Sequence, residues 1–239
     1  MAKASKALQL LFESRKSTPH VKFPHPLKTF FKRFGRSHFR PFPWRDQRTS
    51  AYELLLAEVL LKQTRAEGVV PVWLKLVRKY PDPASLSKAR KTDLTRLLQP
   101  LGLHRQRAAA LKEIGKSISD DFSGNVSGKI QELLSIQHVG LYVASAVICF
   151  KFGKRIPIID SNVLRVFSRI TGIDFGRDIR RNRDAWGLAW AILPRQGVVA
   201  HNFGLLDFAG LICTPRNPQC TICPLRIHCV YARKRLSVI

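Results

Sequence analysis

The chain has 239 residues, enough to bury a sizeable core as one large domain or two small ones. Its 41 Lys and Arg residues against 16 Asp and Glu leave a formal net charge of +25, which argues against an acidic metabolic enzyme and for a polyanionic partner. A membrane is the weaker partner, since no uncharged stretch is a continuous apolar span and no signal-peptide segment follows Met1. The first twenty residues, basic and poor in acids, fit a transit peptide or a solvated basic arm.

Helical periodicity dominates the chain, and the alternation typical of strands is nearly absent. We expect an all-α fold with short connections. The predicted helices cover 27–34, 52–63, 67–79, 92–98, 104–119, 129–135, 142–151, 161–171, 183–193 and 201–212.

Four of the five cysteines lie close together near the C-terminus. Cys213, Cys220, Cys223 and Cys229 have the spacing C-x6-C-x2-C-x5-C, whereas Cys149 lies in an apolar run and is interpreted as a core residue. Thiolates at such short spacing can converge on one centre. Zinc and an iron–sulfur cluster both fit the ligand type, and spacing alone does not separate them from each other. Four unrelated reduced thiols are the remaining alternative.

Two carboxyl groups, Glu58 and Asp160, lie at positions where a carboxyl group can take part in acid or electrostatic catalysis. Glu58 lies on an otherwise apolar helix, where burial of the anion is costly and the protonated form, a possible acid, is favoured. A narrow polar strip shared with Lys62 would instead expose it. Asp160 follows an apolar run and precedes a helix, so it is a helix N-cap, and the helix N-terminus also stabilises its ionised form.

A short turn, Ile136 to Gly140, joins two predicted helices and leads into Tyr142. Such a hairpin can direct backbone N–H groups and a helix N-terminus at a phosphate. An ordinary packing corner between helices would give the same pattern.

Together these segments resemble the helix–hairpin–helix DNA glycosylase superfamily, in its endonuclease III branch. The resemblance runs from about Pro41 to Cys229 and rests on the cysteine spacing and on PFPWR, AEVLLKQT, VGLYVASAV and IDSNVLRV. It implies a [4Fe–4S] cluster, rather than zinc, held by the four C-terminal cysteines. Within the branch, the enzymes for thymine or uracil mispaired with guanine and the adenine enzymes are most similar.

The resemblance also implies a role for individual residues. Asp160 matches the catalytic aspartate that faces the sugar, and Glu58 matches the carboxyl against the flipped base. Asn162 matches a residue that assists near the aspartate and the DNA backbone, and Gln63 matches the side chain that fills the gap left by the extruded nucleotide. Tyr142 stands where bifunctional members carry a lysine. Because a phenol cannot form a Schiff base, the implied enzyme is monofunctional.

The hairpin departs from the family pattern, Leu-Pro-Gly-Val-Gly. Here Gln137 and His138 replace the proline and the first glycine, so His138 has to adopt the turn or the turn differs. His138, Val139 and Gly140 are the expected phosphate contacts of the hairpin, and Arg216, in the cysteine-rich loop, is expected at another phosphate.

By resemblance, residues 48–154 form a six-helix barrel lobe with the hairpin, and residues 1–47 and 155–239 form the cluster lobe, with an active-site cleft between them. The expected substrate is double-stranded DNA with a mismatch, the expected state is a monomer, and no membrane is involved. HNFGLLDFAGLICTPRNPQC and the ten residues after Cys229, too few for the extra domain of adenine enzymes, favour thymine or uracil opposite guanine.

Two other functions stay open: adenine removal opposite guanine or 8-oxoguanine, and a non-catalytic basic DNA-binding protein with a structural cluster. We expect a location with the chromosome, in the cytoplasm (nucleoid) of a prokaryote, or in a nucleus or organelle.

Overall fold

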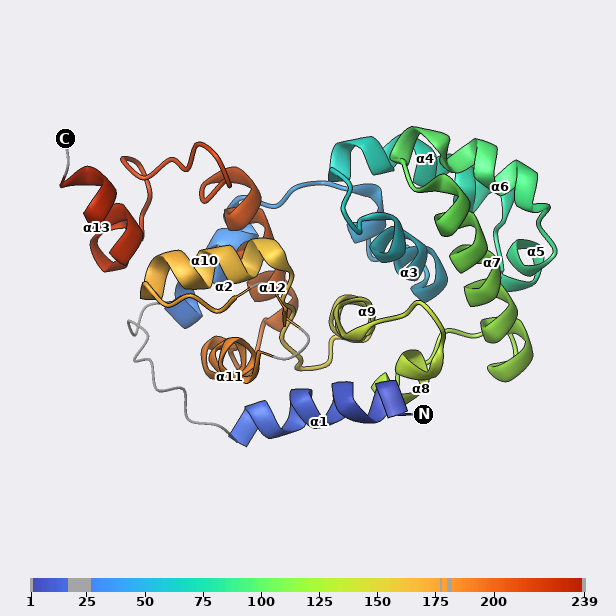
Figure 1. Ribbon diagram of the computed structural model, residues 1–239, viewed down its shortest axis with the longest axis horizontal. Coiled ribbons are helices and arrows are strands. Elements are labelled where there is room, and N and C mark those ends of the chain that lie inside the picture. The colour runs from blue at the N-terminus through green and yellow to red at the C-terminus, as the bar shows by residue number, and fades with distance from the viewer. Residues whose placement is uncertain (1, 17–26, 177, 180–181, 238–239) are drawn as a thin grey trace. The chain divides into compact units, whose positions relative to one another are not determined.

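The structure is a computed structural model that describes residues 2–16, 27–176, 178, 179 and 182–237. Helices and their connections account for all of these residues, and no strand occurs among them. The predicted all-α fold is therefore confirmed (Figure 1).

The chain divides into two compact units, one formed by residues 41–152 and the other by residues 2–40 together with 153–239. The first contains η1 (Pro43–Arg45), α3 (Ala51–Leu60), α4 (Ala66–Lys79), α5 (Pro83–Ser87), α6 (Lys91–Leu98), η2 (Gln99–Leu101), α7 (His104–Asp121), α8 (Ile130–Ser135) and α9 (Leu141–Phe150). The second contains α1 (Ala2–Lys16), α2 (Leu27–Ser37), α10 (Ser161–Thr171), α11 (Arg183–Ile192), α12 (Val198–Leu211), η4 (Arg226–His228) and α13 (Val230–Leu236).

Helix α3 is the central element of the first unit. It begins with a reciprocal capping box between Ser50 and Glu53, and it is buried from Leu54 to Leu60. A helix that is apolar on every face can only be stable inside a core, and here α4 and α9 pack against it. The same helix carries Glu58, so packing of the core of this unit also fixes the position of one predicted site residue.

The second unit depends on a close approach of α2 and α12, which lie side by side in Figure 1. The helices meet where Gly35 faces Gly204, and a Cβ atom on either residue would meet backbone of the opposite helix. Phe31, Phe34 and Phe208 pack edge to face around this contact. Since α12 ends just before Cys213, the glycine contact helps to set the position of the cysteine-rich loop.

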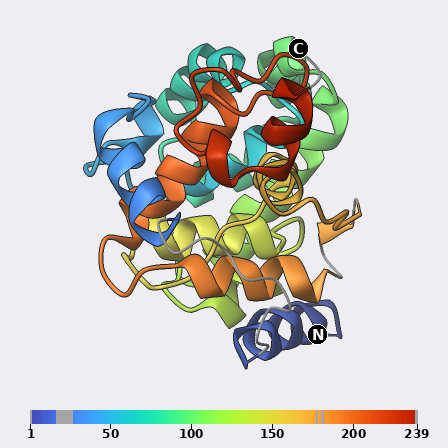
Figure 2. The ribbon, with the colours of Figure 1, turned by 90° about the vertical axis from the view of Figure 1, so that its left-hand side faces the viewer.

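The basic N-terminus is one place where the sequence-based interpretation was wrong. Residues 2–16 form helix α1, which runs alongside α11 (Figure 1, Figure 2) and buries Leu11, rather than a solvated arm. The Nε1 atom of Trp190 donates to the Leu11 carbonyl at 2.9 Å, and Arg15 lies over the ring of the same tryptophan. Arg15 therefore covers aromatic surface (residues 17–20 lie outside the described part).

Two short helices, α5 and α13, were also missed. Asp82 caps α5 and Pro83 occupies its first position, a start signal too short to stand out from a loop. Among the described residues, no helix is long and apolar enough to cross a membrane.

The glycine contact yields a prediction about stability. Gly204→Ala should lower the free energy of unfolding by about 3 kcal/mol, because the added methyl group must push two backbones apart. Gly68→Ala is the matched control: nothing lies within 4 Å of its Cβ position in α4, so it should raise stability by about 0.5–1 kcal/mol. Urea unfolding measures both, and equal effects would contradict the packing interpretation.

Candidate active site and cluster site

Asp160 begins helix α10 and is held by two donors. Its Oδ1 accepts a hydrogen bond from the backbone N–H of Val163 at 2.7 Å, and its Oδ2 accepts one from the side-chain amide of Asn162 at 2.7 Å. The predicted N-cap is thus present. Both oxygens of the half-buried side chain are therefore held in place at the start of α10.

Asn162 connects this carboxylate to the cysteine-rich loop. Its Oδ1 accepts from Arg165 Nη1 at 2.9 Å, and Arg165 Nε donates to the Cys213 carbonyl at 3.0 Å. Arg165 Nη2 also donates to Ala209 O at 2.9 Å near the end of α12. Burial lowers the pKa of Arg165, but a guanidinium remains charged at neutral pH. One arginine therefore ties the start of α10 to the first cysteine.

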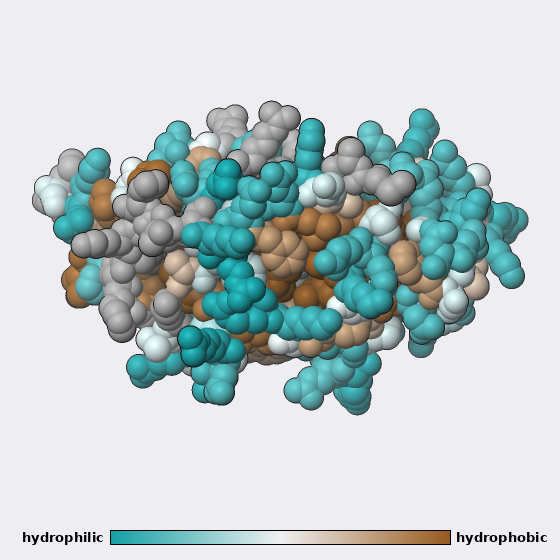
Figure 3. Space-filling view, turned by 90° about the horizontal axis from the view of Figure 1, so that it is seen from below, coloured by the Kyte–Doolittle hydropathy of each residue, from teal (hydrophilic) through white to brown (hydrophobic). Residues whose placement is uncertain are grey.

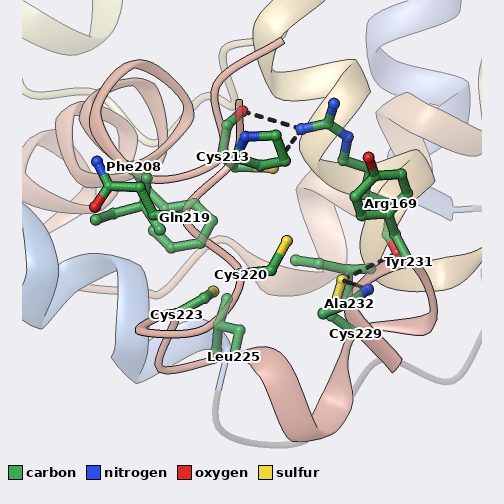
Figure 4. Close-up of a pocket in the computed structure, with 13 residues that line it drawn as sticks. Arg169, Phe208, Cys213, Gln219, Cys220, Cys223, Leu225, Cys229, Tyr231 and Ala232 are labelled. Atoms are coloured by element: carbon green, nitrogen blue, oxygen red, sulfur yellow. Dashed lines mark hydrogen bonds between the residues drawn. The ribbon is translucent and has the colours of Figure 1, made fainter. Parts of the chain in front are cut away.

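The four C-terminal cysteines line one pocket of the second unit (Figure 4). Apolar side chains, among them Phe208 and Leu225, form its wall, and Arg169 lies at its edge with its guanidinium 4.6 Å from the ring centre of Tyr231. Arg169 Nη1 is 3.4 Å from Cys213 Sγ and 2.7 Å from Thr214 O, while Nη2 is 2.8 Å from Pro215 O.

The donor set of this pocket fits a cluster bound by thiolates. Burial raises the pKa of Cys223 to about 11 and also raises that of Cys229, so the bare pocket favours thiols. A bound cation supplies the charge that deprotonates such ligands, and Arg169 and the Ala232 N–H, 3.4 Å from Cys229 Sγ, are donors to sulfur. Among the described His, Cys, Asp and Glu residues, no group of three is arranged to hold a single metal ion.

Glu58 and Tyr142 belong to the first unit. Glu58 lies in α3 and is only 3% exposed, so a solvent-facing polar strip is excluded. Tyr142 is half-buried in the first turn of α9, directly after the hairpin. In the same unit, the last three residues of the PFPWR motif form η1, where Trp44 is buried, stacks on Phe42 at 5.0 Å and meets Trp73 edge to face at 5.8 Å.

The hairpin adopts the turn that the sequence left open. His138 has a φ of +67°, at the third position of a turn closed by Val139 N–H to Ile136 O at 3.2 Å, a position where glycine is favoured. Its Nε2 lies 2.7 Å from Glu113 Oε2, and its carbonyl accepts from Lys62 Nζ at 2.8 Å. These two contacts help to offset the energetic cost of a positive φ at a residue other than glycine.

Gln63 lies in the exposed turn that follows α3, with a φ of +56°. The predicted helix 52–63 therefore ends earlier, at Leu60. Arg216 is exposed in the loop between Cys213 and Cys220, and this loop is held at its base by Arg169.

Several residues that hold the predicted ones in place were not predicted from the sequence, among them Arg165, Arg169 and Glu113. A signal for the first two was present, because Arg165 and Arg169 stand four residues apart on the helix that begins at Asp160.

Comparison with known proteins defines the class of this protein. Residues 56–187 match the HhH-GPD superfamily of base excision DNA repair proteins. The chain belongs to this superfamily.

The relatives within it divide by substrate. The chain is 34% identical to a thymine/uracil-DNA glycosylase of Pyrobaculum aerophilum, over 92% of this chain and 95% of the relative. It is 35% identical to an adenine DNA glycosylase of Mycobacterium tuberculosis, over 80% of this chain and 63% of that relative. The solved structure of a thermostable thymine-DNA glycosylase superposes with a TM-score of 0.81 at 30% identity, covering 93% of this chain and 98% of the other.

The two bonds of Asp160 predict how its variants affect stability. Asp160→Ala should cost about 1 kcal/mol of unfolding free energy, because the α10 cap is lost, whereas Asp160→Asn should cost less, because its amide oxygen still caps α10 and only the bond from Asn162 is lost. Urea unfolding at equal iron content measures the difference. Equal losses for the two variants would mean that the cap contributes little.

Proposed function

We propose that this chain is a monofunctional DNA glycosylase of base excision repair that removes thymine or uracil mispaired with guanine. The observation that carries the proposal is the Asp160 carboxylate, held by two hydrogen bonds, in a chain of this superfamily. The similarity to thymine/uracil-DNA glycosylases over nearly the whole chain supports the choice of base.

The proposed chemistry follows from the bond that is broken. Cleavage of an N-glycosidic bond builds positive oxocarbenium character on the sugar, and a carboxylate next to the anomeric carbon stabilises that charge. We assign this role to Asp160. Asn162 orients the carboxylate, since it donates to the oxygen that the helix cap leaves available.

Glu58 is assigned to the leaving base. Its side chain is only 3% exposed, and a proton or hydrogen bond given to the base helps the base to leave. The base itself has to be extruded from the duplex before any side chain can reach it.

Duplex DNA is the proposed partner of the basic surface. Hydrophilic side chains cover much of the face drawn in Figure 3, and the net charge of +25 supplies affinity for phosphate that does not depend on sequence. We assign phosphate contacts to His138, Val139 and Gly140 of the hairpin and to Arg216, and insertion into the duplex to Gln63. We further propose that residues 48–154 form a six-helix barrel lobe and that residues 1–47 and 155–239 form the cluster lobe. We also propose that the protein is a monomer.

We also propose that Cys213, Cys220, Cys223 and Cys229 hold one [4Fe–4S] cluster. Such a cluster, when bound, supplies the cross-link that ties the C-terminal loop to the end of α12 and the start of α13. The pocket lined by all four cysteines and the donors Arg169 and Ala232 support this assignment.

A panel of duplexes tests the function. The protein is incubated with T:G, U:G, A:G and A:8-oxoguanine pairs in one sequence context, and abasic sites are scored after alkali. Release of thymine and uracil, with adenine untouched, is expected. Adenine release would establish the alternative activity, removal of adenine opposite guanine or 8-oxoguanine. No release from any duplex would favour a DNA-binding protein with a structural cluster.

Tyr142 predicts the reaction type. The unaltered protein should leave the DNA strand intact until alkali is added and should give no borohydride-trapped complex, because a phenol forms no Schiff base. Tyr142→Lys should gain some trapping and strand nicking, and Tyr142→Phe is the control that should gain none. Efficient trapping of the unaltered protein would mean that another amine, such as Lys62 or Lys151, attacks the sugar.

The cluster makes a separate prediction about metal content. Protein purified without oxygen should be brown and contain about four irons per chain. Cys223→Ala should lose the colour and most of the iron, while Cys149→Ala, which alters a buried cysteine of α9 in the other unit, should keep both. A colourless protein with one zinc per chain would refute the cluster.

A further inference from the structure

Two turns of the first unit share an uncommon backbone feature. The turns 61–64 and 136–139 are each closed by a hydrogen bond from the fourth N–H to the first carbonyl, 3.3 Å and 3.2 Å long, and their third residues, Gln63 and His138, have positive φ. For residues other than glycine this conformation costs about 1–2 kcal/mol, so it persists only where surrounding groups hold it.

A single buried arginine holds the first of these turns. Arg107, in α7, is 7% exposed, and its guanidinium donates to Gly102 O and to the segment at the end of α3. Its guanidinium donates to these acceptors: Val59 O at 3.4 Å, Leu60 O at 3.0 Å, Lys62 O at 2.7 Å and Thr64 Oγ1 at 2.7 Å.

These acceptors include carbonyls that the end of a helix leaves without a partner. Arg107 therefore ends α3 and at the same time binds the residues on both sides of Gln63. The cation also lies at the negative end of the α3 dipole, which offsets part of the cost of burying it.

The same turn is joined to the hairpin. Lys62, the neighbour of Gln63, donates to the His138 carbonyl, and His138 is paired with Glu113, six residues beyond Arg107 on α7. Helix α7 thus holds the turn of Gln63 through Arg107 and the hairpin through Glu113, and Lys62 connects the two.

We infer that Arg107 is a positioning residue for Gln63: it holds the turn 61–64 in the conformation from which Gln63 enters the DNA duplex. The inference rests on the proposed function, in which Gln63 fills the gap left by the extruded nucleotide. Arg107 is buried and donates to protein acceptors, so its contribution differs from that of the exposed basic residues that bind phosphate.

Substitutions at Thr64 test this without removing the buried charge. Thr64→Val keeps the shape but deletes the hydroxyl that accepts from Arg107 and donates to Lys62 O, and Thr64→Ser keeps the hydroxyl as the matched control. Arg107→Lys keeps the charge but loses the fork of donors. Lys112→Met removes a cation of the same helix that binds Ala89 O instead, and it should leave every readout unchanged.

Two readouts separate positioning from folding. A fluorescent base analogue beside the target base reports unstacking in the protein–DNA complex, and single-turnover kinetics on a U:G duplex give a rate constant and an amplitude. We expect Thr64→Val and Arg107→Lys to lower unstacking and the rate constant about tenfold, with the amplitude and the dissociation constant for DNA within about twofold. Thr64→Ser should behave as the unaltered protein.

A double-mutant cycle completes the test. Once Gln63→Ala is present, Thr64→Val should cause no further loss, because both changes act on the same step. Additive losses, or a loss of amplitude at an unchanged rate constant, would overturn the inference and leave Arg107 with a purely structural role. If the unaltered protein releases no base, the proposed function fails, and the unstacking comparison still decides the role of Arg107.

Discussion

The carboxylate of Asp160 is half-buried, and hydrogen bonds hold both of its oxygens in place. The first turn of α10 supplies one donor and Asn162 supplies the other, and among the described residues no cation donates to either oxygen. Arg165 carries a positive charge and reaches Asp160 only through Asn162, to whose Oδ1 it donates. Its guanidinium also donates to the carbonyls of Cys213 and Ala209, at the end of α12. A carboxylate arranged in this way can stabilise a cation that forms on a substrate, because it is not already paired.

Arginine has two separate tasks in this chain. Together with the lysines, the arginines give the 41 positive charges behind the net charge of +25, which supplies affinity for a polyanion. Arg107, Arg165 and Arg169 also bind backbone carbonyls where helices and loops end. The planar fork of five donors suits this task, since one side chain satisfies several acceptors that a loop leaves exposed.

The sequence predicted the helices with strong periodicity, the cap at Asp160 and the cysteine-rich loop, because each has a local signature. It could not predict α1, whose basic composition conceals the few apolar residues that pack on α11. The left-handed turns at Gln63 and His138 were also beyond it, since neither residue is a glycine and the groups that hold them, Arg107 and Glu113, come from a distant helix. Spacing alone likewise left zinc and iron–sulfur equal.

The most direct measurement of the central claim is single-turnover base release by Asp160→Asn, with DNA affinity and iron content measured on the same preparation. The amide keeps the cap and the shape but removes the charge. Release of uracil from a U:G duplex should fall by at least about a thousandfold, while the dissociation constant for the duplex and the iron content stay within about twofold. Release at a rate near that of the unaltered protein would contradict the assignment of Asp160 as the group that stabilises the sugar cation.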